Sequence, residues 1–269
     1  MNLVNGIESD VISLHDRGWN YGDGAFRTLL LRNGRPHCWP RHYTKLRDDC
    51  VRLGIACPPS ELFEQDFNFI AERHPDRTIR VVVTRGDMAR GYAASPDIQP
   101  TRVVVAGAVP AYPAEYHDHG VRAHLCRTTF AIQPLLAGIK HLNRLENVLA
   151  RSEWSDPGIA EGIVCDTEGN VVSGTMSNLF AAFGAELLTP DVSRSGVAGV
   201  QRARVLEFSK SRGIMAKTGV FGIVQLLTAD EIFVVNSLIG AWQITSFEGK
   251  SWRSGELTPE FRRWLDGND

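Results

Sequence analysis

The sequence has no apolar run close to the roughly 20 residues that a membrane-spanning helix needs. Its opening, MNLVNG, lacks the basic stretch and apolar core of a secretory signal, so we expect a cytoplasmic protein. It also lacks an excess of either charge. The 29 basic and 31 acidic residues give a net charge of −2, which argues against a nucleic acid as partner. With 43% hydrophobic and 22% charged residues, the composition is typical of a globular enzyme.

Cysteine is scarce and unpaired in its spacing, which argues against a disulfide framework. We expect five reduced thiols, as in a cytosolic protein: Cys38, Cys50, Cys57, Cys126 and Cys165. The only dense group of metal-binding residue types is His117-Asp118-His119, which lies in what looks like a linker, with no further ligand nearby. Zinc sites usually need more ligands, so we expect a solvated loop there and no metal.

Several well-known catalytic motifs are also missing. The chain has no Gly-x-Ser-x-Gly elbow, no Walker loop and no His-Glu-x-x-His helix. These absences argue against the corresponding hydrolases, nucleotide-binding proteins and zinc proteases, so the chemistry must come from other residues.

The apolar pattern predicts a mixture of helices and short strands. Spacings of three and four residues predict one helix over 41–53, ending at Gly54, and another that opens at Gly199 and closes at Gly213. Short apolar, mostly β-branched runs predict buried strands at 80–84, 102–106, 178–183 and 231–235. Residues 163–165 and 171–172 flank the turn sequence 166–170 and predict a hairpin. A helical stripe at Leu142, Leu145, Val148 and Leu149 places Lys140 just ahead of a further helix.

The proline-rich stretch 107–113 has little periodicity and separates two such mixtures. We therefore predict two α+β domains: a smaller one over 1–109, a linker over 110–115 and a larger cofactor-binding domain over 116–269. A cleft between two domains is a common ligand site.

Lys140 is the most unusual lysine in the chain, because it follows the apolar, small-residue run Leu136-Ala137-Gly138-Ile139. Such neighbours exclude water and favour the neutral amine, which is a good Schiff-base former and proton shuttle. A lysine at a strand end that simply reaches water would give the same local sequence, so this stretch alone does not decide its role.

Other motifs also have two interpretations. The stretch 196–202 is a small-residue turn entering a helix, where backbone N–H groups can bind a phosphate, although such turns often have no ligand. Arg85-Gly86 and Arg90-Gly91-Tyr92 can present guanidinium groups to a carboxylate, or form an ordinary exposed turn.

Taken together, the motifs resemble a known family. Asp16-Arg17-Gly18-x-x-Tyr21-Gly22-Asp23-Gly24-x-Phe26 resembles the N-terminal signature of the fold type IV pyridoxal-phosphate enzymes, which include D-amino acid and branched-chain aminotransferases and a lyase branch. The remaining landmarks follow in the family's order: His42-x-x-Lys45-Leu46, Arg90-Gly91-Tyr92, Lys140, Ser177-Asn178-Leu179-Phe180 and Gly196-x-x-Gly199. Residues 137–146, Ala-Gly-Ile-Lys-His-Leu-Asn-Arg-Leu-Glu, resemble the lyase branch in particular. The resemblance spans about residues 5–244.

The resemblance implies a two-domain fold, pyridoxal 5'-phosphate as cofactor and a homodimer. It assigns the cofactor to Lys140 and its phosphate to the 196–201 turn, including Gly199, Val200 and Gln201, with Ser237 as a further donor. Arg90 and Tyr92 would contact substrate carboxylates, and Asn143 and Asn178 would be structural.

Two positions depart from the family pattern. Lys45 stands where the family has a phosphate-binding arginine, so it supplies charge without a bidentate fork, and Arg41 or Arg47 could compensate. Ser173 stands where family members commonly carry a glutamate facing the pyridine nitrogen. A neutral hydroxyl cannot keep that nitrogen protonated as a carboxylate does, which weakens the cofactor as an electron sink.

The implied activity is a lyase that converts 4-amino-4-deoxychorismate to 4-aminobenzoate and pyruvate. Aromatisation of the ring drives that reaction, so a weak electron sink at Ser173 suits it better than transamination. The alternatives are an aminotransferase of the same fold for D- or branched-chain amino acids, and a non-catalytic binding protein that kept the fold. Retention of Lys140 argues against the binding protein.

Overall fold

The computed structural model describes residues 1–95 and 97–267, which form two compact units. The first unit contains residues Met1–Ala111 and Lys140–Asn143, and the second contains Tyr112–Ile139 and Arg144–Asp269. The chain thus leaves the first unit between Ala111 and Tyr112, and the four residues that begin at Lys140 belong with the first unit again.

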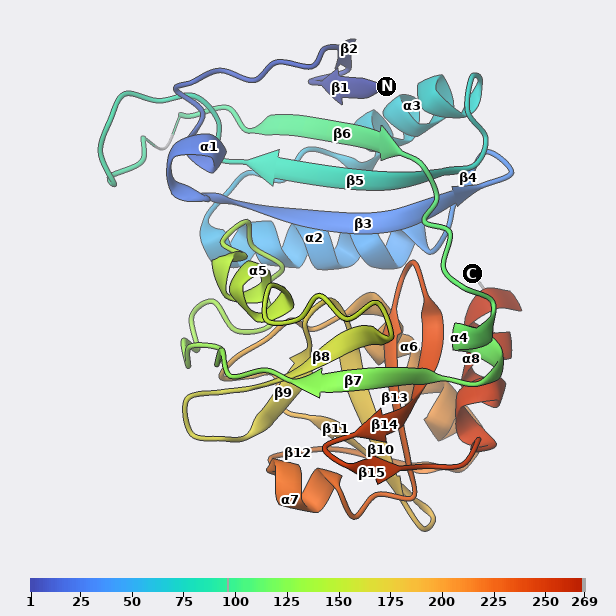
Figure 1. Ribbon diagram of the computed structural model, residues 1–269. Helices are drawn as coiled ribbons and strands as arrows, with labels where there is room; N and C mark the ends of the chain where they lie inside the picture. The colour runs from blue at the N-terminus through green and yellow to red at the C-terminus, as the bar shows by residue number, and fades with distance from the viewer. Residues whose placement is uncertain (96, 268–269) are drawn as a thin grey trace. The chain divides into compact units, whose positions relative to one another are not determined.

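The first unit is a six-stranded antiparallel sheet with two helices packed on it (Figure 1). The strand order is β2-β1-β6-β5-β3-β4, and a buried cluster that includes Leu29, Leu46 and Phe63 joins the sheet to α2 and α3. Its elements are β1 (Asn2–Val4), β2 (Ile7–Glu8), α1 (Arg17–Tyr21), β3 (Gly24–Arg32), β4 (Arg35–Pro36), α2 (Trp39–Leu53), α3 (Ser60–Ala71), β5 (Arg77–Thr84) and β6 (Thr101–Gly107).

The second unit contains a nine-stranded mixed sheet with helices around it. The order is β12-β11-β10-β13-β14-β7-β8-β9, with β15 paired to β14. Its elements are α4 (Glu115–Asp118), β7 (Val121–Leu125), α5 (Leu145–Arg151), β8 (Ile159–Cys165), β9 (Val171–Gly174), β10 (Asn178–Phe183), β11 (Glu186–Pro190), α6 (Val200–Ser211), β12 (Met215–Gly219), α7 (Ile223–Leu226), β13 (Glu231–Asn236), β14 (Gly240–Phe247), β15 (Lys250–Ser251) and α8 (Leu257–Gly267).

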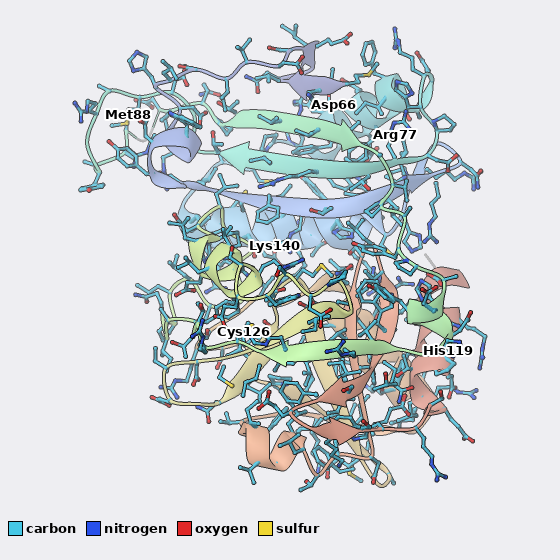
Figure 2. The ribbon with its side chains drawn as sticks, viewed as in Figure 1. Asp66, Arg77, Met88, His119, Cys126 and Lys140 are labelled. Carbon is cyan, nitrogen blue, oxygen red and sulfur yellow. The ribbon has the colours of Figure 1, made fainter. Side chains whose placement is uncertain are left out.

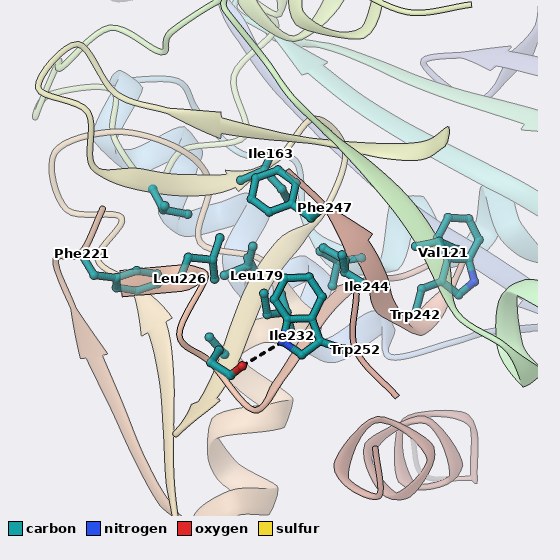
Figure 3. Close-up of a cluster of buried hydrophobic side chains, with 14 of the residues drawn as sticks. Val121, Ile163, Leu179, Phe221, Leu226, Ile232, Trp242, Ile244, Phe247 and Trp252 are labelled. Atoms are coloured by element: carbon teal, nitrogen blue, oxygen red, sulfur yellow. Dashed lines mark hydrogen bonds between the residues drawn. The ribbon is translucent and has the colours of Figure 1, made fainter. Parts of the chain in front are cut away.

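The curved sheet of the second unit encloses its own core. Figure 3 shows side chains of β8, β10, β13 and β14 meeting in one apolar cluster, with Trp252 at its edge. The indole N–H of Trp252 donates to the Ala229 carbonyl at 2.8 Å, so the one polar atom of this side chain is satisfied. A second cluster packs α6 and α8 on the other side of β10 and β13, around Phe180, Phe233 and Phe261.

Most predicted elements are confirmed. The helix predicted over 41–53 is α2, which ends at Gly54 with φ +65°, and the helix after Gly199 is α6. The strands predicted at 80–84, 102–106, 178–183 and 231–235 are β5, β6, β10 and β13, and the 163–172 hairpin is β8–β9.

Two local predictions need correction. His117 and Asp118 lie in the short helix α4 and not in a loop, because the turn 115–118 packs against β14, with the His117 ring 6.4 Å from that of Trp242. The helix after Lys140 begins only at Leu145, so Leu142 is outside it.

None of the helices among the described residues combines the length and apolarity needed to cross a bilayer. All five cysteines are free thiols.

Candidate active site

The segment that begins at Lys140 is added to the edge of β3 as a short antiparallel stretch. The Phe26 N–H donates to the Lys140 carbonyl at 2.9 Å, and the Leu142 N–H donates to the Gly24 carbonyl at 3.0 Å. Strand β4 pairs with β3 only at Leu31 and Arg32, so this end of the edge is open to the added segment. The backbone of Lys140 is therefore held by the sheet of the first unit.

Glycines allow this close approach. A Cβ at Gly24 would lie 2.8 Å from the Leu142 side chain, and one at Gly22 would lie 2.3 Å from Asn143 Oδ1. Gly22 also has φ +65°, which other residues rarely adopt. The two glycines of the Gly22-Asp23-Gly24 motif thus make room for the segment that carries the lysine.

The Lys140 side chain (Figure 2) is half-buried and lies over an aromatic ring. Its Nζ is 4.7 Å from the centroid of the buried Phe26 ring. Its backbone N–H donates to Asp49 Oδ2 of α2 at 3.0 Å. Asp49 is itself paired with Arg27 of β3, and both side chains are buried. Phe26 is thus an apolar neighbour of the Lys140 amine.

Lys45 lies one turn before Asp49 on α2. Its backbone carbonyl accepts a hydrogen bond from Arg27 Nη2 at 3.0 Å, and its charge acts on Asp49. The side chain is half-buried. The alternatives Arg41 and Arg47 are exposed, and Arg47 lies 3.7 Å from Asp48.

Arg90 and Tyr92 lie in an exposed loop of the first unit that Arg17 tethers. The Arg17 guanidinium donates to the Gly91 carbonyl at 2.7 Å and to the Tyr92 carbonyl at 3.0 Å. Asp23 fixes Arg17 through a 2.8 Å ion pair. Tyr92 is 87% exposed, so the loop offers this side chain and Arg90 to ligands from solution.

The turn before α6 is built from small residues. Gly196 has φ +82°, and Gly138, two residues before Lys140 in the sequence, pairs with this turn through Gly138 N–H to Gly196 O at 2.9 Å and Ala198 N–H to Gly138 O at 3.0 Å. The Asn178 amide donates to the Val197 carbonyl at 2.8 Å. Asn178 thus holds the turn, which agrees with its expected structural role.

The same turn presents the first N–H groups of a helix. Gly199 is the N-cap of α6 and provides no side-chain cap, so the first-turn N–H groups, including those of Val200 and Gln201, point out of the helix end. Gln201 is buried, and its amide lies 3.5 Å from Ser237 Oγ at the end of β13. A Cβ on Gly199 would lie 2.1 Å from Asn178 Oδ1, so a larger residue would displace the Asn178 side chain. A helix N-terminus of this kind can bind an anion.

Ser173 lies on β9, opposite Val164 of β8, and is buried. Its hydroxyl donates to the Gly174 carbonyl at 2.8 Å, which leaves the oxygen lone pairs as acceptors. No carboxylate stands at this position.

A carboxylate that the sequence analysis missed lies on the neighbouring strand. Glu161 of β8 is completely buried, and it accepts hydrogen bonds from the Thr175 N–H at 2.9 Å, the Thr175 hydroxyl at 2.5 Å and the Ser177 hydroxyl at 2.6 Å. Burial raises the pKa of Glu161, and these donors act in the opposite direction. It fixes the connection from Ser173 to Asn178. A glutamate within an otherwise apolar strand was the signal available in the sequence.

The predicted site residues are thus divided between the two units. Lys45, Arg90, Tyr92 and Lys140 belong to the first unit, and Ser173, Gly199, Val200, Gln201 and Ser237 belong to the second. Among the described residues, no group of three or more His, Cys, Asp or Glu side chains could hold a metal ion.

A family model described as amino-transferase class IV matches residues 24–247. The chain belongs to this family. The motif resemblance and the α+β, fold type IV architecture predicted from it are therefore confirmed.

Individual relatives cover the whole chain. An aminodeoxychorismate lyase of Vibrio harveyi is 31% identical over 268 residues, which span 100% of this chain and 99% of the relative. The crystal structure of 4-amino-4-deoxychorismate lyase from Pseudomonas aeruginosa superposes on this chain with a TM-score of 0.96 at 41% identity. The match covers 100% of this chain and 99% of the Pseudomonas chain. The branched-chain amino acid aminotransferase of Escherichia coli shares the fold, with a TM-score of 0.88 at 21% identity over 99% of this chain and 93% of its own.

Proposed function

We propose that this protein is a pyridoxal-phosphate-dependent lyase that converts 4-amino-4-deoxychorismate to 4-aminobenzoate and pyruvate. The full-length likeness to the Pseudomonas aeruginosa lyase, at 41% identity and a TM-score of 0.96, carries the proposal. The putative branched-chain-amino-acid aminotransferase of Methanocaldococcus jannaschii is 28% identical and the D-alanine aminotransferase of Bacillus licheniformis 26%, below the 31% and 41% of the two lyases described above. The serine at position 173 supports the same choice, because it gives no carboxylate to keep a pyridine nitrogen protonated.

The residues present fit the cofactor. The uncapped N-terminus of α6, with Val200 and Gln201, suits a phosphate, and Ser237 adds a hydroxyl close to Gln201. The missing Cβ at Gly199 keeps the turn compact. Lys45 is the cation that we assign to the phosphate, and Lys140 is the lysine that we assign to the covalent bond with the cofactor. When bound, the cofactor withdraws electrons from the substrate carbon that bears the amine.

Lys140 is the residue that we assign to proton transfer. In its neutral form the Lys140 amine would remove the proton from the amine-bearing ring carbon, and the bond between the adjacent ring carbon and the ether oxygen would break. The ring becomes 4-aminobenzoate. The released enolpyruvate takes the proton back from Lys140 at its methylene carbon and becomes pyruvate. The exposed Arg90 and Tyr92 are our candidates for holding the substrate carboxylates.

We further propose a homodimer in the cytoplasm. Helix α5 exposes an apolar stripe, with Leu145 75%, Val148 57% and Leu149 60% accessible. A contiguous exposed stripe of this kind is typical of a surface that another protein covers. The five free cysteines suit a reducing compartment.

The test is to incubate the purified protein with enzymatically generated aminodeoxychorismate and to follow 4-aminobenzoate and pyruvate. We expect equal amounts of both products, none with Lys140→Ala, and normal release with Lys210→Ala, which changes an exposed lysine of α6. A visible absorption band that titrates with added pyridoxal phosphate distinguishes the enzyme from a binding protein of the same fold. Turnover of D-alanine or branched-chain amino acids with 2-oxoglutarate, without pyruvate from aminodeoxychorismate, would contradict the proposal in favour of an aminotransferase.

A further inference from the structure

Arg27 occupies a core position of β3. Its neighbours two residues away on the same face of the strand, Ala25 and Leu29, belong to the apolar cluster under α2. Arg27 is 2% exposed and Asp49 is 1% exposed, so their ion pair is fully inside the protein. Among the described residues, nothing accepts a hydrogen bond from Arg27 Nε, which is also buried.

Stability alone does not explain this pair. Removing two charges from water is costly, and an apolar pair of similar volume often stabilises a core as well or better. The unsatisfied Nε adds a further cost. The buried cluster that joins the sheet of the first unit to α2 and α3 otherwise consists of apolar side chains. A pair that is unfavourable for packing points to another role.

Asp49 contacts the segment that carries the proposed catalytic lysine. Its Oδ2 accepts the Lys140 backbone N–H at 3.0 Å and also binds Arg27 Nη2. The same Nη2 donates to the Lys45 carbonyl at 3.0 Å. Arg27 thus links β3, α2 and, through Asp49, residue 140. A charge-assisted acceptor holds an N–H more firmly than a neutral one.

A lone carboxylate at this point would have a second effect. It would favour the ammonium form of a nearby amine, and an ammonium group neither bonds to a carbonyl carbon nor removes a proton. Arg27 supplies the opposite charge at the same carboxylate, so the pair has no net charge. Burial raises the pKa of Asp49, while Arg27 and the Lys140 N–H lower it.

We propose that Arg27 and Asp49 are positioning residues for Lys140: the carboxylate holds the lysine backbone, and the guanidinium cancels the negative charge at that point, so that it does not favour the ammonium form of the lysine. The inference rests on the proposed function only in taking Lys140 as the reactive lysine. Other charged or titratable groups around the pair and the lysine are Lys45, Asp48, Cys50 and Arg52 on α2, Arg80 on β5, whose guanidinium is 4.5 Å from the Phe26 ring centroid, and His141.

The test uses the full-length, cofactor-free protein with Arg27→Gln, Asp49→Asn and the double variant Arg27→Gln/Asp49→Asn. Each protein is pulse-labelled with acetic anhydride across a range of pH, and acetylation of Lys140 is read by peptide mass spectrometry. A unit charge near an amine inside a protein is worth on the order of one pH unit. We therefore expect the labelling midpoint to rise by about one unit in Arg27→Gln and to fall by about one unit in Asp49→Asn. In the double variant it should return to within about 0.3 unit of wild type.

The control is Asp48→Asn, the same substitution one residue earlier at a side chain that is 51% exposed, and it should leave the midpoint unchanged. Midpoints that stay unchanged in both single variants, or that move in the same direction, would overturn the inference. A purely structural pair would lower stability in both variants without opposite shifts. Because no cofactor is present in this assay, its outcome is independent of whether the protein makes 4-aminobenzoate.

A second pair of variants keeps the inference testable if the single variants do not fold. Arg27→Gln/Asp49→Asn keeps an acceptor for the Lys140 N–H, whereas Arg27→Met/Asp49→Leu fills the same space without one. Hydrogen exchange at the Lys140 amide should be at least about tenfold faster in the apolar double variant. Equal protection in the two double variants would show that Asp49 does not hold the lysine backbone.

Discussion

Replacing Glu161 with alanine is expected to lower the free energy of unfolding by about 3–5 kcal/mol. The carboxylate accepts hydrogen bonds from the Gly162 N–H, the Thr175 N–H and the hydroxyls of Thr175 and Ser177. The Thr175 N–H also donates to the Gly162 carbonyl at 2.9 Å, so it keeps a partner in the variant. In the variant the Gly162 N–H and one or both of the hydroxyls have no hydrogen-bond partner. Each buried donor without a partner costs about 1–3 kcal/mol.

The remainder of the loss comes from the cavity that the deleted side chain leaves, since Glu161 is fully buried between β8 and the 174–177 connection. A loss of this size is a large fraction of the roughly 5–15 kcal/mol that stabilises a typical protein. Urea unfolding followed by circular dichroism measures it, with Glu256→Gln, an exposed glutamate of the same unit, as control. A loss below about 1 kcal/mol would refute the reasoning.

Replacing Glu161 with glutamine removes the charge of the side chain but keeps its shape. Burial raises the pKa of Glu161 above its ordinary value of 4.5. The folded state therefore binds the proton more tightly than the unfolded state. The stability that this tighter binding contributes is fully present below pH 4.5. It is lost as the pH rises from 4.5 towards the folded-state pKa. Wild type should thus lose stability over this range while the glutamine variant does not, so the cost of the substitution should shrink as the pH rises. A cost that grows with pH would mean that the donors stabilise an ionised carboxylate.

Three further predictions concern other parts of the protein. Gly199→Ala places a methyl group 2.1 Å from Asn178 Oδ1 and should weaken pyridoxal phosphate binding more than tenfold in an absorbance titration, whereas Gly107→Ala, with nothing within 4 Å, should leave it unchanged. Leu149→Glu puts a charge in the α5 stripe and should convert the proposed dimer to a monomer by analytical ultracentrifugation; an unchanged mass would place the interface elsewhere. Burial raises the pKa of Glu153, but N–H and hydroxyl donors outweigh this effect and lower the pKa to about 2. The ionised Glu153 therefore stabilises the folded state above pH 4.5, and this stabilisation is lost as the pH falls towards 2. Glu153→Gln should remove that dependence in acid unfolding, and an unchanged acid limb would contradict it.

Helices and strands with regular apolar spacing could be predicted from the sequence. The three- and four-residue spacing of Leu46, Cys50 and Leu53 was sufficient for α2, because that face packs on the sheet. Gly54 ended it because glycine adopts the required positive φ without strain. The turn at Gly199 was predicted correctly for another reason: Gly199 has φ −72°, and its missing Cβ leaves room for the Asn178 side chain.

The placement of residues 140–143 could not be predicted in the same way. These residues join the first unit through backbone hydrogen bonds to Gly24 and Phe26, which depend little on side-chain identity. Their sequence therefore contains no periodic signal for the pairing. The exposed stripe of α5 has the spacing of a buried helix face. Periodicity does not distinguish a helix face that its own chain covers from one that is available to another protein chain.

The buried charges were missed for a different reason. Arg27 interrupts an apolar strand, Asp49 lies at a buried position of α2, and Glu161 interrupts β8. A sequence shows each as an irregularity but does not show its partner: Arg27 and Asp49 are 22 residues apart, and the hydroxyl donors to Glu161 lie 14 and 16 residues beyond it. Each of these charges holds a backbone segment adjoining a predicted site residue, Lys140 in one case and Ser173 in the other.

The cost of burying a charge explains why these buried charges lie next to predicted site residues. Apolar residues that replaced one of these charges together with its partners would satisfy the packing, so selection for stability alone would favour them. A directed hydrogen bond fixes a backbone group in one position, which apolar contacts do less well because they are not directional. Where a site needs a lysine or a strand end held in place, the charge is retained despite its cost. Departures from the apolar pattern in the strands and helices therefore indicate positioning residues of the site more directly than the family motifs do.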